Sequence, residues 1–235
     1  MIDAFSRGLA WYRYKRLEDE FINTTPYFPF EKRYKKIWSE FFSDLLVKIG
    51  NSVDSFFRYM LKDKSFQSYP HVPALKGRKK DVNYFRDFFE PIYKLSGMEV
   101  DTAYGLTFYD RKCCPFEEFK NNKIPIWWNS YNHVKHKWFD CIEEATLANT
   151  VEALAGLFVL NIIHKESQEY LIKYQNVIVG DFIGTMPQSF LMKAFKSSMI
   201  GIPKDFKYTC VARTPLFTHV FRVDENARIT KYFAV

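Results

Sequence analysis

The sequence has little cysteine, and its cysteines are not spaced like a disulfide framework or a zinc site. The 235 residues contain only Cys113, Cys114, Cys141 and Cys210, with no Cys-x-x-Cys pair. Adjacent cysteines rarely bridge each other, and structural zinc sites use closely spaced cysteine pairs. We therefore expect neither a disulfide-stapled domain nor a zinc knuckle. Cys113-Cys114 also lacks a recognisable base partner, which argues against a nucleophilic cysteine.

Several catalytic signatures are absent from the sequence. There is no glycine-rich phosphate loop, no Gly-x-Ser-x-Gly elbow and no His-Glu-x-x-His helix. A nucleotide-dependent enzyme, a serine hydrolase and a zinc protease therefore have no sequence support. We expect no cofactor and no metal.

Long uninterrupted apolar runs are also missing. The most hydrophobic window, Ala145 to Ile163, contains Asn149, Glu152 and Asn161, so it predicts a buried core helix rather than a membrane span. The first sixteen residues have no continuous apolar core and no small-residue cleavage site, which predicts no signal peptide. We expect a cytoplasmic protein without a membrane partner.

The composition favours a folded, basic domain. Apolar residues make up 47% of the chain and aromatic residues 19%, enough for a large core, and the formal charge is +7. A basic balance favours contact with phosphate backbones or acidic surfaces. The basic residues are clustered at Arg13, Lys15 and Arg16, at Lys32, Arg33, Lys35 and Lys36, and at Lys76, Arg78, Lys79 and Lys80.

Hydrophobic periodicity predicts a mainly α protein, a helical bundle with a small C-terminal antiparallel β element. The expected helices cover residues 1–25, 35–63, 82–95, 126–137 and 143–165, and the expected strands cover 177–179, 207–212, 218–223 and 229–235, with a strand or turn near 104–109. We divide the chain into a bundle (1–169) and a C-terminal extension (170–235). Gly50 is expected to mark a close helix crossing, and Asp54 and Arg58 are spaced to pair on one helix.

The segment 126–138 is dense in aromatic, histidine and amide residues. One helical stripe comprises Trp127, Trp128, Tyr131, Val134, Lys135 and Trp138, and the other comprises Asn129, Asn132, His133, His136 and Asp140. A polar stripe usually faces solvent, but this one flanks aromatic residues, so a cleft-facing cluster is the alternative.

Three segments resemble the HEPN superfamily, small helical bundles of bacterial and archaeal defence and toxin systems. They are the helix from Phe42 to Arg58, the Trp-Trp-x-x-Tyr-Asn-x-Val-Lys-His helix and the Ala/Leu-rich helix after it. The resemblance covers residues 35–165. It implies a dimeric, metal-independent ribonuclease with an Arg followed four to six residues later by His. His136 matches that His, but positions 129–131 hold Asn, Ser and Tyr instead of Arg.

The resemblance suggests specific roles for the residues around His136. His136 would be the acid/base, Asn132 and Lys135 would position and neutralise the phosphate, and Asp54 would orient the cluster. Lys135, Lys137, Arg58 or Arg111 could replace the missing Arg. Alternatively, Asn132 and His136 form a structural pair bonded to Asp54 or to the backbone.

Further residues are candidates for contacting nucleic acid. These are Lys137, His133, Lys76, Arg78, Lys79 and Lys80. Trp127, Trp128 and Trp138 could stack on bases beside the lysines, although tryptophan at helical spacing is more often core. His133, His136 and Asp140 could present three metal ligands on one face, a reading we rank below the others.

Two functions remain open at this point. The first is a HEPN-like protein that acts on RNA, as a metal-independent ribonuclease in a defence or toxin–antitoxin setting. The second is a non-catalytic dimeric scaffold or nucleic-acid-binding module with a structural polar cluster. The expected partners are RNA, a second copy of the chain and a cognate antitoxin or defence protein.

Overall fold

The computed structural model describes residues 8–24, 26–27, 30–102, 112–164, 167, 170–171, 177–180, 208–223 and 229–233. The described chain is mainly helical and carries an antiparallel sheet, which confirms the predicted fold class. The strand or turn expected near 104–109, and Arg111, lie outside the described residues. The α-helices are α1 (Leu9–Ile22), α2 (Glu40–Met60), α3 (Val82–Tyr93), α4 (Ile126–His136), α5 (Trp138–Cys141) and α6 (Leu147–Ile163).

Side-chain caps explain where two helices begin later than expected. The Ser39 hydroxyl accepts a hydrogen bond from the Phe42 amide at 3.1 Å, so α2 begins after Ser39 rather than at Lys35. Likewise Thr146 accepts from the Asn149 amide at 3.2 Å and starts α6. Each cap satisfies a backbone donor that the first helical turn leaves free.

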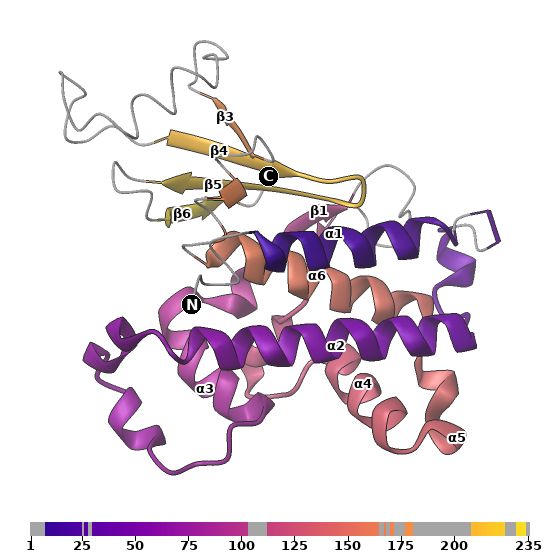
Figure 1. Cartoon of the computed structure of the whole chain (residues 1–235), viewed down its shortest axis with the longest axis horizontal. Helices are drawn as coiled ribbons and strands as arrows, with labels where there is room; N and C mark the ends of the chain where they lie inside the picture. Colours follow the sequence, from indigo (N-terminus) through magenta and orange to yellow (C-terminus); the bar gives the residue numbers. More distant parts are fainter. Residues whose placement is uncertain are drawn as a thin grey trace.

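Helix α6 is the centre of the core. Fifteen of its residues are buried, among them every residue from Ala153 to Ile163, as expected for a core helix in this window. No helix in the described part of the chain has both the length and the apolarity to cross a membrane. Figure 1 shows α1 and α6 in one layer, with α2 on one side of it and the sheet on the other.

The sheet draws on both halves of the chain. Its strands are β1 (Val100–Thr102), β2 (Lys112–Cys113), β3 (Val177–Gly180), β4 (Tyr208–Arg213), β5 (Phe217–Val223) and β6 (Ile229–Phe233). The order is β2-β1-β5-β4-β3. β1 pairs with the start of β5, at Phe217 and Thr218, and β6 pairs with the rest of β5, from Val220 to Val223. The four C-terminal strands confirm the prediction, whereas β1 and β2 were not expected. The proposed boundary at residue 170 therefore does not separate sheet from bundle.

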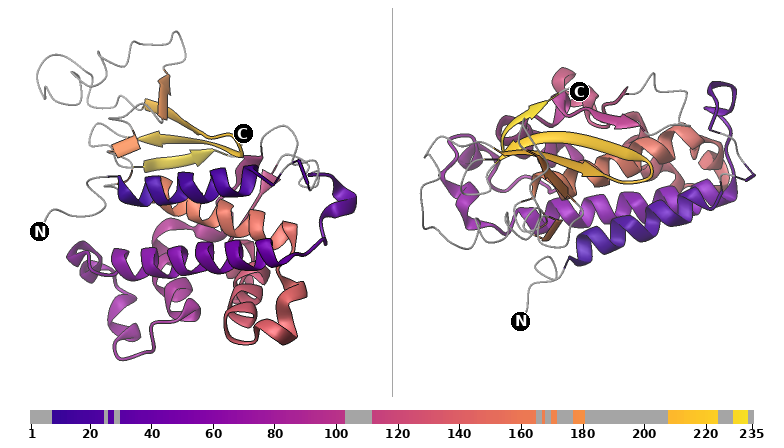
Figure 2. Two further views of the ribbon diagram at one scale, coloured as in Figure 1. Left: turned by 45° about the vertical axis from the view of Figure 1, so that its right-hand side comes forward. Right: turned by 90° about the horizontal axis from the view of Figure 1, so that it is seen from above.

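A buried carboxylate joins the sheet to α1. Glu18 is fully buried and accepts hydrogen bonds from the Tyr14 hydroxyl at 2.8 Å and the Leu216 amide at 3.2 Å, and it pairs with Lys15. Tyr14 also bonds Thr214 at 3.2 Å. Burial and the nearby Glu18 charge raise the pKa of Tyr14 well above its usual value, so it stays a donor. The β4–β5 turn is thereby held against α1, and the left view of Figure 2 shows the hairpin next to this helix.

The expected close crossing at Gly50 is present. A Cβ at Gly50 would lie 2.3 Å from the Tyr131 ring, a distance that real Cβ contacts do not reach. Tyr131 belongs to α4 and is 2% exposed, and its hydroxyl donates to Asn51 Oδ1 at 2.9 Å. The missing side chain thus lets α4 lie directly on α2.

We predict that Gly50→Ala destabilises the protein. Alanine gains about 1 kcal/mol of helix propensity, but overpacking a closed core costs about 1–3 kcal/mol or more, and the contacted ring is buried. Chemical denaturation should therefore show a net loss of up to about 2 kcal/mol. Gly97→Ala is the control, since nothing lies within 4 Å of its added Cβ. Equal stability of the two variants would contradict the crossing.

Candidate functional site

The predicted candidate residues meet in a hollow between α2, the start of α3 and α4. Its volume is about 240 Å³. It is lined by Asp54, Arg58, Lys79, Lys80, Asp81, Val82, Trp128, Tyr131, Asn132, Lys135 and His136, a set we call the α2–α4 pocket. Figure 1 shows α3 and α4 on the same side of α2. All four residues predicted to be catalytic line this pocket, together with two of the loop lysines.

Arg58 holds one wall of the α2–α4 pocket. Its Nε and Nη2 donate to the two oxygens of Asp54 at 2.6 and 3.2 Å, as the i, i+4 spacing predicted, and Nη2 also donates to the Lys80 carbonyl at 2.9 Å. The hydrogen bond to Asp54 raises the pKa of Arg58. Through the Lys80 carbonyl, Arg58 keeps the Lys79–Lys80 segment at the mouth of the pocket.

Lys135 is held on the opposite wall by neutral groups. Its Nζ donates to Asn51 Oδ1 and to the Tyr131 hydroxyl, both at 2.9 Å, and lies 5.2 Å from the Tyr131 ring centroid. No carboxylate neutralises this ammonium among the ion pairs of the described residues. Lys135 therefore keeps its full charge for an anion entering the pocket.

His136 and Asn132 both line the α2–α4 pocket. His136 is exposed and Asn132 half-buried, and neither side chain makes a hydrogen bond to another described residue. The alternative of a structural pair bonded to Asp54 therefore has no such bond to support it. Asp54 binds Arg58 instead, so it orients the guanidinium and not the imidazole.

The remaining candidates for nucleic-acid contact divide into three groups. Lys79 and Lys80 line the pocket and are exposed. Arg78 instead pairs with Asp87 at 2.8 Å, and His133 pairs with Glu144 at 3.0 Å. Lys76 and Lys137 are exposed but do not line the pocket.

The tryptophans of α4 are core. Trp127 and Trp128 are at most 2% exposed, and Trp127 Nε1 donates to the Pro115 carbonyl at 2.7 Å. Neither ring presents a face for base stacking. Trp138 is 36% exposed, but its Nε1 donates to Ser43 at 2.8 Å, which ties α5 to α2.

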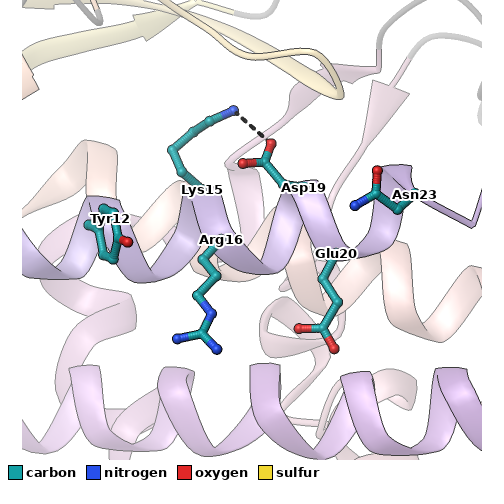
Figure 3. A pocket seen from close by; sticks show the side chains of 6 residues that line it. All are labelled: Tyr12, Lys15, Arg16, Asp19, Glu20 and Asn23. Atoms are coloured by element: carbon teal, nitrogen blue, oxygen red, sulfur yellow. Dashed lines mark ion pairs between the residues drawn. The ribbon is translucent and has the colours of Figure 1, made fainter.

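Two other hollows lie along α1. One of about 610 Å³ shares Arg58 with the α2–α4 pocket and adds Arg13 and Lys62 to the basic lining, so the positive surface continues past Arg58 towards α1. The other, of about 410 Å³, is lined by α1 and its C-cap residue Asn23 (Figure 3). There Lys15 pairs with Asp19 at 3.9 Å, and Glu20 points towards α2 and pairs with Lys48. Internal pairing makes this last hollow a poor anion site.

Sequence reasoning underestimated the part that α2 plays in the site. Arg58 was expected to pair with Asp54 and was named as one substitute for the missing Arg, and Asn51 was not among the candidate site residues. Asn51, Asp54 and Arg58 are spaced three and four residues apart, which places them on one helical face. That spacing was a signal, but only the crossing at Gly50 brings this face to α4.

The described cysteines do not behave as activated nucleophiles. Cys113 is buried, and burial raises the pKa of its thiol well above the usual value. Burial, with Glu99 and Glu117 nearby, raises the pKa of Cys114 to about 11. The reactive form of cysteine is the thiolate, so both side chains are protonated at neutral pH.

We predict that Cys114 alkylates slowly at pH 8. A thiol pKa of about 11 instead of 9.0 lowers the thiolate fraction about 100-fold. Labelling with iodoacetamide, read for each cysteine by peptide mass spectrometry, should accelerate as the pH rises towards 11. The unfolded chain is the control and should label fast at pH 8. Fast labelling of native Cys114 at pH 8 would instead identify an activated thiol.

The function has to be inferred from the geometry of this pocket. Comparison of the chain with protein-family models, with curated proteins and with solved structures gives no match in any of the three. The α2–α4 pocket, with four cations, two carboxylates and one exposed histidine in its lining, is the site on which a functional conclusion depends.

Proposed function

We propose that the protein binds RNA in the α2–α4 pocket and cleaves it as a metal-independent endoribonuclease. The observation that carries this proposal is the convergence of His136 with Arg58, Lys79, Lys80 and Lys135 in one hollow. Cations supply the affinity for a phosphate backbone, and an imidazole is the side chain best suited to move a proton near neutral pH.

The proposed reaction is attack of a ribose 2′-hydroxyl on the adjacent phosphorus. His136 takes the 2′-hydroxyl proton, the new P–O bond forms as the bond to the 5′-oxygen breaks, and a proton from water or a second acid goes to that oxygen. The products are a 2′,3′-cyclic phosphate and a 5′-hydroxyl. Lys135 stabilises the charge that builds on the phosphate oxygens, because it is uncompensated and fixed by Asn51 and Tyr131.

Arg58 is the proposed substitute for the arginine missing from positions 129–131. It lines the same pocket as His136, and Asp54 holds its guanidinium in one orientation. Lysine could not reproduce this geometry, because only the planar guanidinium donates to Asp54 and the Lys80 carbonyl together. Asn132, half-buried in the lining, would position the substrate.

The second candidate is a non-catalytic RNA-binding module or dimeric scaffold. The pairing of Arg58 with Asp54 favours it, because a neutralised guanidinium stabilises a transition state less than a free one. The exposed side chains of Phe139 (91% exposed) and Trp38 (48% exposed) would each suit contact with another protein.

The biological setting of this proposal follows from the HEPN resemblance. In it the protein works in the cytoplasm as a homodimer, within a defence or toxin–antitoxin system. A cognate antitoxin or defence protein would be its regulator. The two pockets of such a dimer would share one RNA strand.

We predict that His136→Ala abolishes RNA cleavage by the purified protein. Loss of the acid/base should lower the rate about 100- to 10,000-fold, and chelator should leave the wild-type rate unchanged. The assay follows a labelled RNA in chelator and identifies the 2′,3′-cyclic phosphate end. Asn132→Ala should also slow cleavage, whereas Asn129→Ala, exposed on the same helix and outside the pocket lining, should not.

We also predict that the double variant Lys79→Ala/Lys80→Ala binds RNA more weakly and that its affinity depends less on salt concentration. Single-stranded binding loses a salt slope of about 0.7 per phosphate contact, so two contacts lower the slope by about 1.4. Fluorescence anisotropy across a salt series measures it. Lys32→Ala/Lys36→Ala removes the same charge at the other end of α2 and should change the slope less. If the wild type binds RNA without cleaving it, the second candidate function is favoured. If the two double variants lower the salt slope equally, RNA does not bind specifically in the α2–α4 pocket.

A further inference from the structure

Three potential metal ligands meet at the corner where α4 gives way to α5 and the short 3-10 turn Ile142–Glu144. They are the imidazole of His133, the thiol of Cys141 and the carboxylate of Glu144. Their ligand atoms all lie within 4.8 Å of one another. This group lies outside the lining of the α2–α4 pocket, and the functional proposal does not use it.

The ligand atoms of the group are already close to the spacing that a metal ion needs. His133 Nδ1 is 3.0 Å from both carboxylate oxygens of Glu144, and the Cys141 sulfur lies within 4.8 Å of a ligand atom of each. Around a tetrahedral Zn²⁺, with bonds of about 2.0–2.3 Å, ligand atoms lie about 3.4–3.8 Å apart. Side-chain rotations that move the ligand atoms by about 1 Å therefore suffice to enclose an ion.

The backbone that carries the three ligands is fixed by other contacts. Asn149 Nδ2 donates to the Glu144 carbonyl at 2.8 Å and to Ser130 at 2.9 Å. The Cys141 amide donates to the Lys137 carbonyl at 3.0 Å. The ligands are therefore held close together before any ion binds, which lowers the entropy cost of binding.

We propose that His133, Cys141 and Glu144 form a binding site for a divalent transition metal, with Zn²⁺ as the best fit. Thiolate and imidazole favour Zn²⁺ over Mg²⁺ or Ca²⁺, which prefer all-oxygen shells. One thiolate and one carboxylate balance the two positive charges of the ion. Three protein ligands leave the fourth position to water, and the exposed side of His133 gives that position access to solvent.

The bound ion would clamp the last turn of α4 to the turn before α6. The contact between His133 and Glu144, which are eleven residues apart, would be replaced by three bonds to the ion. The metal site stands or falls independently of RNA cleavage.

The test is titration of the full chain, first stripped with chelator, with Co²⁺ and then with Zn²⁺. We expect one equivalent of Co²⁺ to bind with a thiolate-to-cobalt charge-transfer absorption, and Zn²⁺ to displace it. Cys141→Ser should remove the absorption. His133→Gln and Glu144→Gln should weaken binding more than about 10- to 100-fold, the range measured for loss of a mere second-shell partner.

Matched controls are Cys114→Ser and Glu143→Gln, which change a second part-exposed thiol and an exposed neighbouring carboxylate outside the group. Both should bind Co²⁺ like the wild type. The circular dichroism of each variant establishes that it is folded. Absence of saturable binding by the wild type would overturn the proposal, as would binding that persists in folded Cys141→Ser and His133→Gln proteins.

Discussion

The contact between Gly50 and Tyr131 is the constraint on which the pocket depends. A side chain at position 50 would overlap the Tyr131 ring, so only glycine lets α2 and α4 come this close. Tyr131 then bonds Asn51 and supports Lys135. Because both helices also pack against α6, one close contact fixes how the face of α2 meets the face of α4. Asp54 and Arg58 on α2 thereby face Asn132 and His136 on α4.

Within that frame, the charges of the pocket differ in how far they are neutralised. The charge of Arg58 is neutralised in part by Asp54, and its guanidinium also donates a hydrogen bond to the Lys80 carbonyl. Lys135 is held only by neutral oxygens. A fixed but uncompensated cation attracts an anion strongly at little reorganisation cost. Lys135 is thus the less neutralised of the two cations, and Arg58 also holds the wall of the pocket through the Lys80 carbonyl.

The two ends of the last turn of α4 face different chemical environments. His136 opens to the basic pocket, whereas His133 contacts Glu144 beside Cys141. Three residues apart, the two imidazoles lie at different angles around the helix axis. Far from both, buried Glu18 holds the β4–β5 turn on α1, which gives the sheet its place without touching either site. The contact that attaches the sheet to α1 is thus separate from the α2–α4 pocket and from the group of His133, Cys141 and Glu144.

The sequence by itself determined the α-helices other than the short α5, the four C-terminal strands and the core of α4, because apolar periodicity reports which face of an element is buried. It also indicated Gly50 and the Asp54–Arg58 pair, which are local features. It did not indicate β1 and β2, which are too short to carry a pattern and form by pairing with each other and with β5. Only the tertiary structure decided that Arg58 and Lys80 lie with His136, and that His133 lies with Cys141 and Glu144. Those groupings join residues on different elements, and their distances depend on how the helices cross.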